Sequence, residues 1–194
     1  MTERTGSRRS GSTFSVQLIV FLGLMGALAV VLSYVGTIHI TSYLRVGISD
    51  LPNRLTDFLL GPFIGALFGG VMDAVKYLLQ PDGPFFPGFT LSAVCGSLIF
   101  GAVTHGRHGH RLSLARIFTA ELLIKVFVNM GMNTAWSCML YGKSFMAILP
   151  ARAIANLIQL PMDTVIIYSV LLALDKARVL SKMRMWLKLA VQQS

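Results

Sequence analysis

The sequence predicts an all-α membrane protein with both of its termini in the cytoplasm. Hydrophobic residues make up 54% of the chain and charged residues only 13%, whereas a soluble domain carries about 25% charged residues. Several apolar stretches are long enough to cross a bilayer as helices. Lysine and arginine also gather in segments that fall on one side of the membrane when successive helices cross it in alternate directions.

The first half of the chain is predicted to contain three helices. Residues 16–35 form an uncharged apolar stretch of about 20 residues, the length that spans a bilayer. Residues 36–49 are polar, β-branched and interrupted by glycine, which predicts a loop. A short helix is expected at 50–60. Gly61-Pro62 ends it, and the proline favours the start of the next helix, expected at 63–79.

The second half alternates between apolar stretches and connections rich in glycine, proline or basic residues. Three further helices are expected, and the last of them should be interrupted at Pro150 and Pro161. One membrane domain over residues 16–178 is therefore predicted between a disordered basic tail at 1–15 and a basic tail at 179–194. The predicted helices cover 89–104, 113–139 and 145–175, and the connections cover 80–88, 106–111 and 141–144.

The positions of the basic residues predict the orientation of the chain. Positive charge collects on the cytoplasmic side of membrane proteins. With a cytoplasmic N-terminus, the opposite loops hold only Arg45 and Lys143. The same distribution explains the net charge of +9 as topology and headgroup contact, and it argues against nucleic acid as a partner. The basic residues predicted on the cytoplasmic side are Arg4, Arg8, Arg9, Arg107, Arg111, Arg116, Lys176, Arg178, Lys182, Arg184 and Lys188.

Polar side chains repeat on one face of three predicted helices. Four large polar residues on one face cannot point toward lipid, because every polar group there needs a partner. Ordinary bonding between helices absorbs one or two such residues, but not stripes on three helices at once. We therefore expect these faces to line a polar cavity that opens to the outside. The stripes are Asp73, Lys76 and Tyr77; Asn129, Asn133 and Ser137; and Arg152, Asn156, Gln159 and Asp163.

Two groups of charged residues have a structural interpretation. A charged stripe on the short helix at 50–60 is expected to pair with itself, because opposite charges lie three or four residues apart. Lys125 and Asp163 lie near the expected midplane and predict a structural salt bridge, with Glu121 one turn away as a further partner of Lys125. The stripe on the short helix consists of Asp50, Arg54 and Asp57.

The sequence lacks several catalytic motifs. It contains no Walker A, GxSxG, HExxH or CxxC pattern, so no catalytic residue, metal site or cofactor is predicted. Cys95 and Cys138 lie among apolar residues and are interpreted as packing residues. A cluster of histidines in a basic connection is interpreted as a solvated turn rather than a metal site. These histidines are His105, His108 and His110.

Two further features concern contacts with neighbours. Gly23 and Ala27 give the first helix a face of small residues spaced four apart, a pattern that lets another helix approach closely and suggests a partner subunit. The stretch FFPGF at 85–89 is either a stiff aromatic lid or part of the aromatic belt at the membrane interface.

Five segments together resemble the folate-specific S components of energy-coupling factor (ECF) transporters. The similarity runs over about residues 16–178, and its most specific parts are FFPGFTLSA and the asparagine, tryptophan and arginine positions of the last two segments. The segments are YLRVGISDLP (43–52), LLGPFIGALFGGVMDAV (59–75), PFFPGFTLSA (84–93), NMGMNTAWSCMLYGKSF (129–145) and LPARAIANLIQLPMD (149–163).

This resemblance implies a six-helix S-component bundle in the cell membrane of a bacterium. Such a subunit captures its substrate at the extracellular side and then topples in the membrane while docked to a transmembrane coupling subunit and two ATPase subunits. It would not itself be an enzyme. S components dock through an AxxxA-like face of the first helix, and here Gly23 and Ala27 are the equivalent positions.

The resemblance and the chemistry of folate together imply a ligand site. A pterin offers a flat ring with a donor and acceptor edge, which calls for aromatic side chains and amide or carboxylate partners. The anionic glutamate tail calls for arginine or lysine. Ring contacts are expected from Asp73, Tyr77, Asn133 and Trp136; contacts to the tail or a ring oxygen from Arg45, Lys143 and Arg152; and the rest of the pocket from Asn156 and Phe89.

Three alternatives stay open at this point. The residue types of the pocket do not separate folate from riboflavin, thiamine or a queuosine precursor. A membrane-embedded enzyme would have to use Asp163 with Lys125. A free-standing channel or carrier would transport in liposomes without ATPase partners, whereas an S component alone should bind tightly and turn over poorly.

Overall fold

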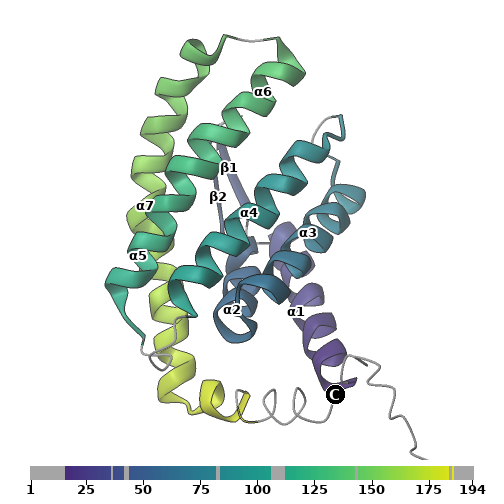
Figure 1. The fold of residues 1–194 in the computed structure, drawn as a ribbon, viewed down its shortest axis with the longest axis vertical. Helices are drawn as coiled ribbons and strands as arrows, with labels where there is room; N and C mark the ends of the chain where they lie inside the picture. The colour runs from purple at the N-terminus through teal and green to yellow at the C-terminus, as the bar shows by residue number, and fades with distance from the viewer. Residues whose placement is uncertain are drawn as a thin grey trace, which may run out of the picture.

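The computed structural model describes residues 16–35, 37–41, 44–81, 84–105, 112–142, 144–183 and 185. Over these residues the chain forms a helical bundle with one short β-hairpin (Figure 1). The elements in order are α1 (Val16–Val35), β1 (Thr37–Thr41), β2 (Leu44–Gly47), η1 (Ile48–Asp50), α2 (Leu51–Leu60), α3 (Pro62–Leu79), α4 (Pro87–Thr104), α5 (Leu114–Leu123), η2 (Ile124–Met132), α6 (Asn133–Tyr141) and α7 (Phe145–Lys176).

The helix ends fall into two groups, one at each end of the bundle. In Figure 1 the start of α1, the end of α4, the start of α5 and the end of α7 lie toward the bottom. The end of α3, the start of α4 and the junction of α6 with α7 lie toward the top. By length and composition, α1, α3, α4 and α7 are suited to cross a membrane. This arrangement agrees with the predicted all-α membrane fold.

The corner between α2 and α3 follows the predicted break. Gly61 adopts a left-handed φ of 86°, its N–H donates to Asp57 O at 3.1 Å, and Pro62 begins α3. Only glycine takes such a φ without strain, and proline fits the first helical position because its missing N–H would have no partner there. A Cβ on Gly101 would lie 2.6 Å from the Pro62 Cα, so α4 crosses this corner at close range.

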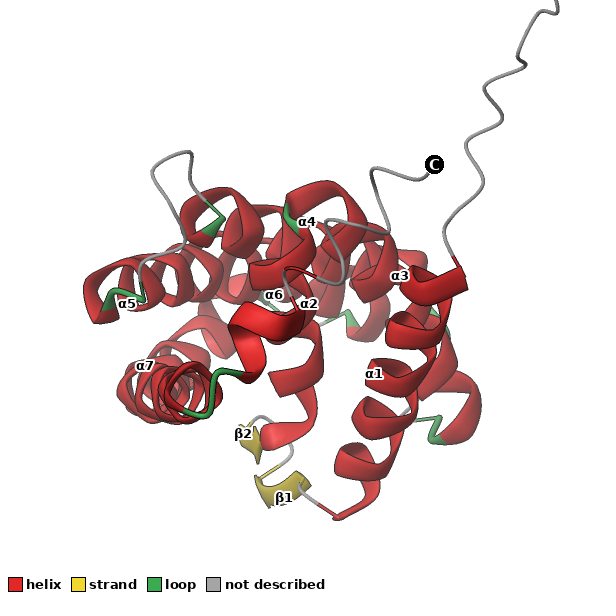
Figure 2. Cartoon of the chain, turned by 90° about the horizontal axis from the view of Figure 1, so that it is seen from below, coloured by secondary structure: helices red, strands yellow, loops and turns green. Residues whose placement is uncertain are grey.

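The prediction of a loop at 36–49 is wrong for most of that segment. β1 and β2 pair antiparallel, with Thr37 opposite Gly47 and Ile38 opposite Val46. The many β-branched residues that accompany the glycines favour extended backbone, and pairing satisfies their polar groups. Figure 2 places the hairpin at the side of the bundle, between α1 and α7.

The prediction that prolines interrupt the last helix is also wrong. α7 runs without a break from Phe145 to Lys176, with Pro150 and Pro161 inside it. In membrane helices, neighbouring side chains and small backbone adjustments satisfy the carbonyls that a proline leaves free. The predicted helix at 113–139 does form one rod, but its middle third, η2, is a π-helix.

The bundle is apolar outside and partly polar inside. Large apolar side chains such as Leu24, Leu67 and Leu157 are exposed, whereas Asp57, Glu121 and other ionisable groups are buried. A soluble protein normally shows the reverse, since Asp and Glu are almost never fully buried unless paired. The surface therefore suits lipid, and the interior must supply the partners of the polar groups.

Candidate functional site

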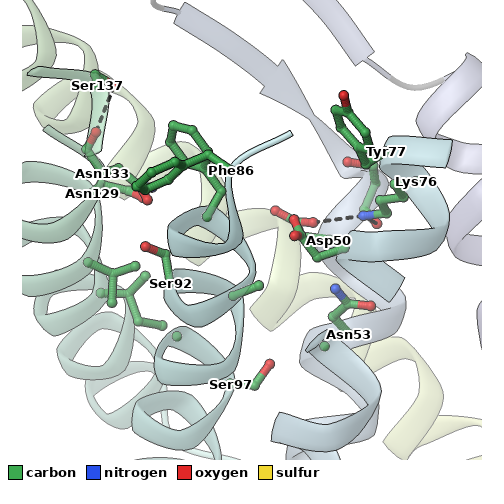
Figure 3. A pocket seen from close by; sticks show the side chains of 18 of the residues that line it. Asp50, Asn53, Lys76, Tyr77, Phe86, Ser92, Ser97, Asn129, Asn133 and Ser137 are labelled. Carbon is green, nitrogen blue, oxygen red and sulfur yellow. Dashed lines mark hydrogen bonds and ion pairs between the residues drawn. The ribbon is translucent and has the colours of Figure 1, made fainter. Parts of the chain in front are cut away.

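A cavity of about 930 Å³ lies among η1, α2, α3, α4, η2, α6 and α7. Polar side chains enter it from opposite walls (Figure 3). Asp50, Asn53, Lys76 and Tyr77 lie on one side, Asn129, Asn133 and Ser137 on the other, and Phe86, Ser92 and Ser97 between them. Its size is within the range of small-molecule sites. All three predicted polar stripes contribute to the lining, and of their members only Asp163 lines a smaller neighbouring cavity instead.

An amide network forms one wall. The Asn133 side-chain amide donates to Asn129 Oδ1 at 3.1 Å, and the Asn129 amide donates to Asn156 Oδ1 at 3.3 Å. This row of hydrogen bonds links α6, η2 and α7. Among the described residues, no donor reaches Asn133 Oδ1, although the atom is buried. A buried acceptor without a partner is costly, so this oxygen is available to a donor on a bound molecule.

The guanidinium of Arg152 lies beside this network. It donates to Ser137 Oγ at 2.6 Å and to the Asn129 backbone carbonyl at 3.5 Å. Both of these partners are neutral oxygens, one on η2 and one on α6, and Ser137 is itself buried. A guanidinium held in this way presents a planar set of donors to carboxylate or carbonyl oxygens.

Aromatic rings cover another part of the cavity. The Phe86 ring lies 5.6 Å from the Trp136 ring and 6.0 Å from the Phe89 ring, between centroids. Trp136 donates its indole N–H to Ser92 Oγ at 3.1 Å, so it stands directly behind two lining residues. A Cβ on Gly88 would lie 2.7 Å from the Trp136 ring, which leaves room only for glycine there. This surface suits a flat ring.

The facing wall carries acidic and basic groups. Thr90 donates to Asp73 Oδ2 at 2.8 Å, which fixes this carboxylate at the cavity. Lys76 donates to Asp50 Oδ1 at 3.0 Å and to the Ser49 carbonyl at 3.1 Å. The Tyr77 ring packs against Phe85, with 5.0 Å between centroids. Donors and acceptors are thus both present opposite the amide network.

Next to the large cavity, two ion pairs line a smaller one of about 220 Å³. Lys125 contacts Asp163 at 2.6 Å, which confirms the predicted salt bridge. Glu121 contacts Arg54 at 3.0 Å, so the expectation that it partners Lys125 is wrong. The stripe on α2 is not simply self-paired either. Arg54 lies 3.7 Å from Asp57, but Asp50 pairs with Lys76 on α3, because helix packing brings closer partners than the helix itself offers.

The structure brings most of the predicted site residues to one place. Trp136 lies one layer behind the lining, and Gly23 and Ala27 are exposed on α1, where nothing lies within 4 Å of a Cβ built on Gly23. The side chain of Arg45 and the whole of Lys143 lie outside the described residues, although the backbone of Arg45 belongs to β2. The predicted residues that line the cavity are Asp73, Tyr77, Phe89, Asn133, Arg152 and Asn156.

Several lining residues were not among the predicted contacts. Asn129 and Gln159 belong to the polar stripes, so their spacing carried the signal. Asn53 is a neighbour of Arg54 on α2, and its Oδ1 is buried without a described donor. Ser92 and Ser97 on α4 form no periodic polar stripe, and small hydroxyl residues are common in membrane helices. No pattern in the sequence could have separated these two from packing residues.

Comparisons with known proteins identify relatives of the whole membrane domain. The family model described as "ECF transporter, substrate-specific component" matches residues 17–171. The Folate transporter FolT of Clostridium novyi (strain NT) is 28% identical over 167 residues, covering 86% of this chain and 95% of the relative. The Folate transporter FolT of Leuconostoc mesenteroides is 31% identical over 157 residues, covering 78% and 83%. A crystal structure of FolT bound with folic acid matches with a TM-score of 0.70 and 27% identity, covering 80% of this chain and 92% of that one.

Proposed function

Because the chain belongs to the family of substrate-specific components of ECF transporters, we propose that it is the folate-binding membrane subunit of such a transporter. Two relatives of similar length are folate transporters, and a solved relative of the same fold binds folic acid. In this proposal the subunit takes folate from outside the cell. It then delivers the vitamin by toppling on a coupling subunit, while two partner ATPase subunits hydrolyse ATP.

The polar cavity inside an apolar bundle is the observation that carries the proposal. The unpartnered Asn133 Oδ1 suits the amino or ring N–H donors of a pterin, and the Phe86 and Phe89 rings suit its flat faces. Arg152, held by neutral oxygens at the cavity, suits a ring carbonyl or a carboxylate of the glutamate tail. A folate offers all of these groups in one molecule.

The proposed contacts follow from these positions. Asp73, Tyr77 and Asn133 would contact the pterin ring, with Trp136 supporting the aromatic wall from behind. Arg152 would bind a ring oxygen or the tail, and Asn156 and Phe89 would complete the pocket. Arg45 and Lys143 remain proposed partners of the glutamate tail, since the first belongs to the hairpin and the second to the segment between α6 and α7.

The orientation and the docking surface are part of the same proposal. The ends of α4 and α7 lie on the side of the bundle where the predicted cytoplasmic charges gather, together with the start of α1. Both termini, with the tails at 1–15 and 179–194, would then be cytoplasmic in a bacterial cell membrane. The exposed Gly23 and Ala27 would form the contact with the coupling subunit, because small residues let a partner helix approach closely.

The test is to identify the ligand that the purified protein carries. The protein is extracted in a mild detergent, bound small molecules are released, and mass spectrometry identifies them. We expect a folate, and we expect calorimetric titration of ligand-free protein with folic acid to give a single saturable site. Recovery of riboflavin, thiamine or a queuosine precursor, with no folic acid binding, would change the proposed substrate but not the family assignment.

A further inference from the structure

The π-helix η2 lies at the cavity wall, between α5 and α6 of the same rod. Its nine residues, Ile124–Met132, are longer than the single-turn bulges in which π-helices mostly occur. At its end the Asn133 N–H donates to the Val128 carbonyl, five residues earlier. Such segments are rare and frequently lie at functional sites. The proposed substrate contacts do not by themselves require one.

The π-helix changes which side chains share a face. In an α-helix, four residues overshoot a full turn by about 40°, so residues spaced four apart fan out along the helix. A π turn contains more residues, because its bonds join i to i+5, and four residues fall short of a full turn. When a π turn is followed by α-helix, the shortfall of one offsets the overshoot of the other, so residues spaced four apart stay closer to one line along the helix. Asn129, Asn133 and Ser137 line the same cavity (Figure 3) with less divergence than a regular α-helix would give, and Lys125 lines the smaller neighbouring cavity.

The same segment also positions backbone and side-chain groups of Asn129. Its carbonyl accepts from Thr134 Oγ1 at 3.3 Å, again five residues away, and from Arg152 at 3.5 Å. Its side chain accepts from Asn133 and donates to Asn156. One residue of η2 thus touches three of the proposed substrate contacts.

We propose that η2 is the positioning element of the substrate site and that Asn129 is the positioning residue through which it acts. The inference rests on the proposed function, since it concerns the orientation of Asn133, Arg152 and Asn156 toward the ligand. If η2 reverted to an α-helix, the Asn129 carbonyl would return to an i+4 bond. The side chains at spacing four would diverge around the helix, and the Asn129 carbonyl would be less available to Thr134 and Arg152.

The first experiment deletes Phe127, which lies in η2, is 61% exposed and does not line the cavity. Removing one residue lets the segment form i to i+4 bonds with little change of the flanking helices. We expect the affinity for folic acid to fall at least about tenfold, as for the loss of one or more hydrogen bonds. The melting temperature without ligand should stay near that of the parent. The matched control is Phe127→Leu, which keeps the chain length and should bind like the parent.

The second experiment does not depend on whether the deletion folds. It measures folic acid dissociation constants for Asn129→Ala, Asn133→Ala and the double variant, with the ligand-free melting temperature of each. If Asn129 acts by holding Asn133, the second substitution should cost much less once the first is present, since coupled residues are not additive. A double variant weakened by the full product of the single effects, or a Phe127 deletion that folds and binds like the parent, would overturn the proposal. A parent that binds no folic acid would instead refute the proposed substrate, and the same cycle would then be run with the ligand that co-purifies.

Discussion

At the scale of single residues, Arg152 is oriented in advance to bind an anionic or carbonyl oxygen. Its guanidinium is held by Ser137 Oγ at 2.6 Å, so its orientation is set before a ligand arrives. Preorganised donors bind more tightly because less freedom is lost on binding. The planar fork of arginine, rather than its charge alone, is the property that this geometry uses.

The substitution Arg152→Lys tests this use of the fork. Lysine keeps the charge but loses the paired donors, and we expect folic acid affinity to fall about ten- to hundredfold. Calorimetry of the purified variant measures the change. Arg116→Lys, at an exposed position on α5, is the matched control and should leave affinity unchanged. Equal affinity of both variants and the parent would show that the ligand does not use the paired donors of Arg152.

Gly88 tests the aromatic wall. A Cβ there would collide with the Phe86 ring and, at 2.7 Å, with the Trp136 ring, so Gly88→Ala must displace both rings. We expect an affinity loss of about tenfold, since one favourable ring contact is worth roughly 0.5–1.5 kcal/mol. Folic acid titration measures this loss, and the ligand-free melting temperature serves as the control for folding. A variant with parental affinity would place the ring site elsewhere.

Much of the candidate site was predictable at this scale because large polar side chains on membrane helices need partners. Spacing alone selected Asn133, Arg152 and Asn156, which the structure brings to one cavity. It could not select Ser92, whose hydroxyl is small enough to pack in any membrane helix. It also could not predict that Trp136 lies behind Ser92, because periodicity gives the helix face of a side chain but not which residues of other helices cover it.

Between elements, the ion pair of Lys125 with Asp163 joins η2 to α7. Lys125 is buried, and it also donates to Gln159 at 3.1 Å. A charge in this position depends on its counter-ion, since removing one partner of a buried pair leaves the other uncompensated. The pair therefore links the rod that carries Asn129 to the helix that carries Arg152.

The substitution Asp163→Asn should destabilise the protein, by on the order of 3 kcal/mol, because Lys125 would lose its charged partner. A thermal melt in detergent measures this loss. Replacing both residues, with Lys125→Met and Asp163→Leu, should recover most of the stability, since no unpaired charge remains. A single variant as stable as the parent would indicate that the pair is solvated and contributes nothing.

The elements that the sequence misassigned share a cause. The hairpin at 37–47 depends on pairing between its two strands, and the prolines of α7 and the π turn of η2 depend on their surroundings in the bundle, so none of them follows from local propensity. Local propensity treats glycine as a loop signal and proline as a helix breaker, but tertiary packing overrides both. Apolar length, by contrast, is a property of the segment alone, and it placed α1 at Val16–Val35 as predicted.

At the scale of the whole molecule, the bundle separates three surfaces. The outer face is apolar, the interior encloses a polar cavity, and α1 exposes small residues at Gly23 and Ala27. An apolar exterior suits the chain to lipid, and the cavity offers a site for a small molecule. In the proposed transporter the α1 face would supply the contact through which binding is coupled to ATP hydrolysis elsewhere.

The substitution Ala27→Leu separates binding from transport. The larger side chain should hinder a close helix contact on α1 and abolish folate uptake in cells that supply the coupling subunit and the ATPases. Folic acid binding by the isolated subunit should be unchanged. Val31→Leu, at an exposed position on the same helix, is the control and should transport normally. Normal uptake with Ala27→Leu would move the docking surface elsewhere.

The fluorescence of Trp136 offers the most direct test of the central claim, that folate enters this cavity. The sequence contains two tryptophans, so Trp186→Phe leaves Trp136 as the single reporter, 5.6 Å from the Phe86 ring at the cavity. Titration with folic acid should quench its emission in a saturable manner, with the affinity found by calorimetry and a stoichiometry of one. Binding by calorimetry without any change in Trp136 emission would contradict the account, since the ligand would then occupy another site.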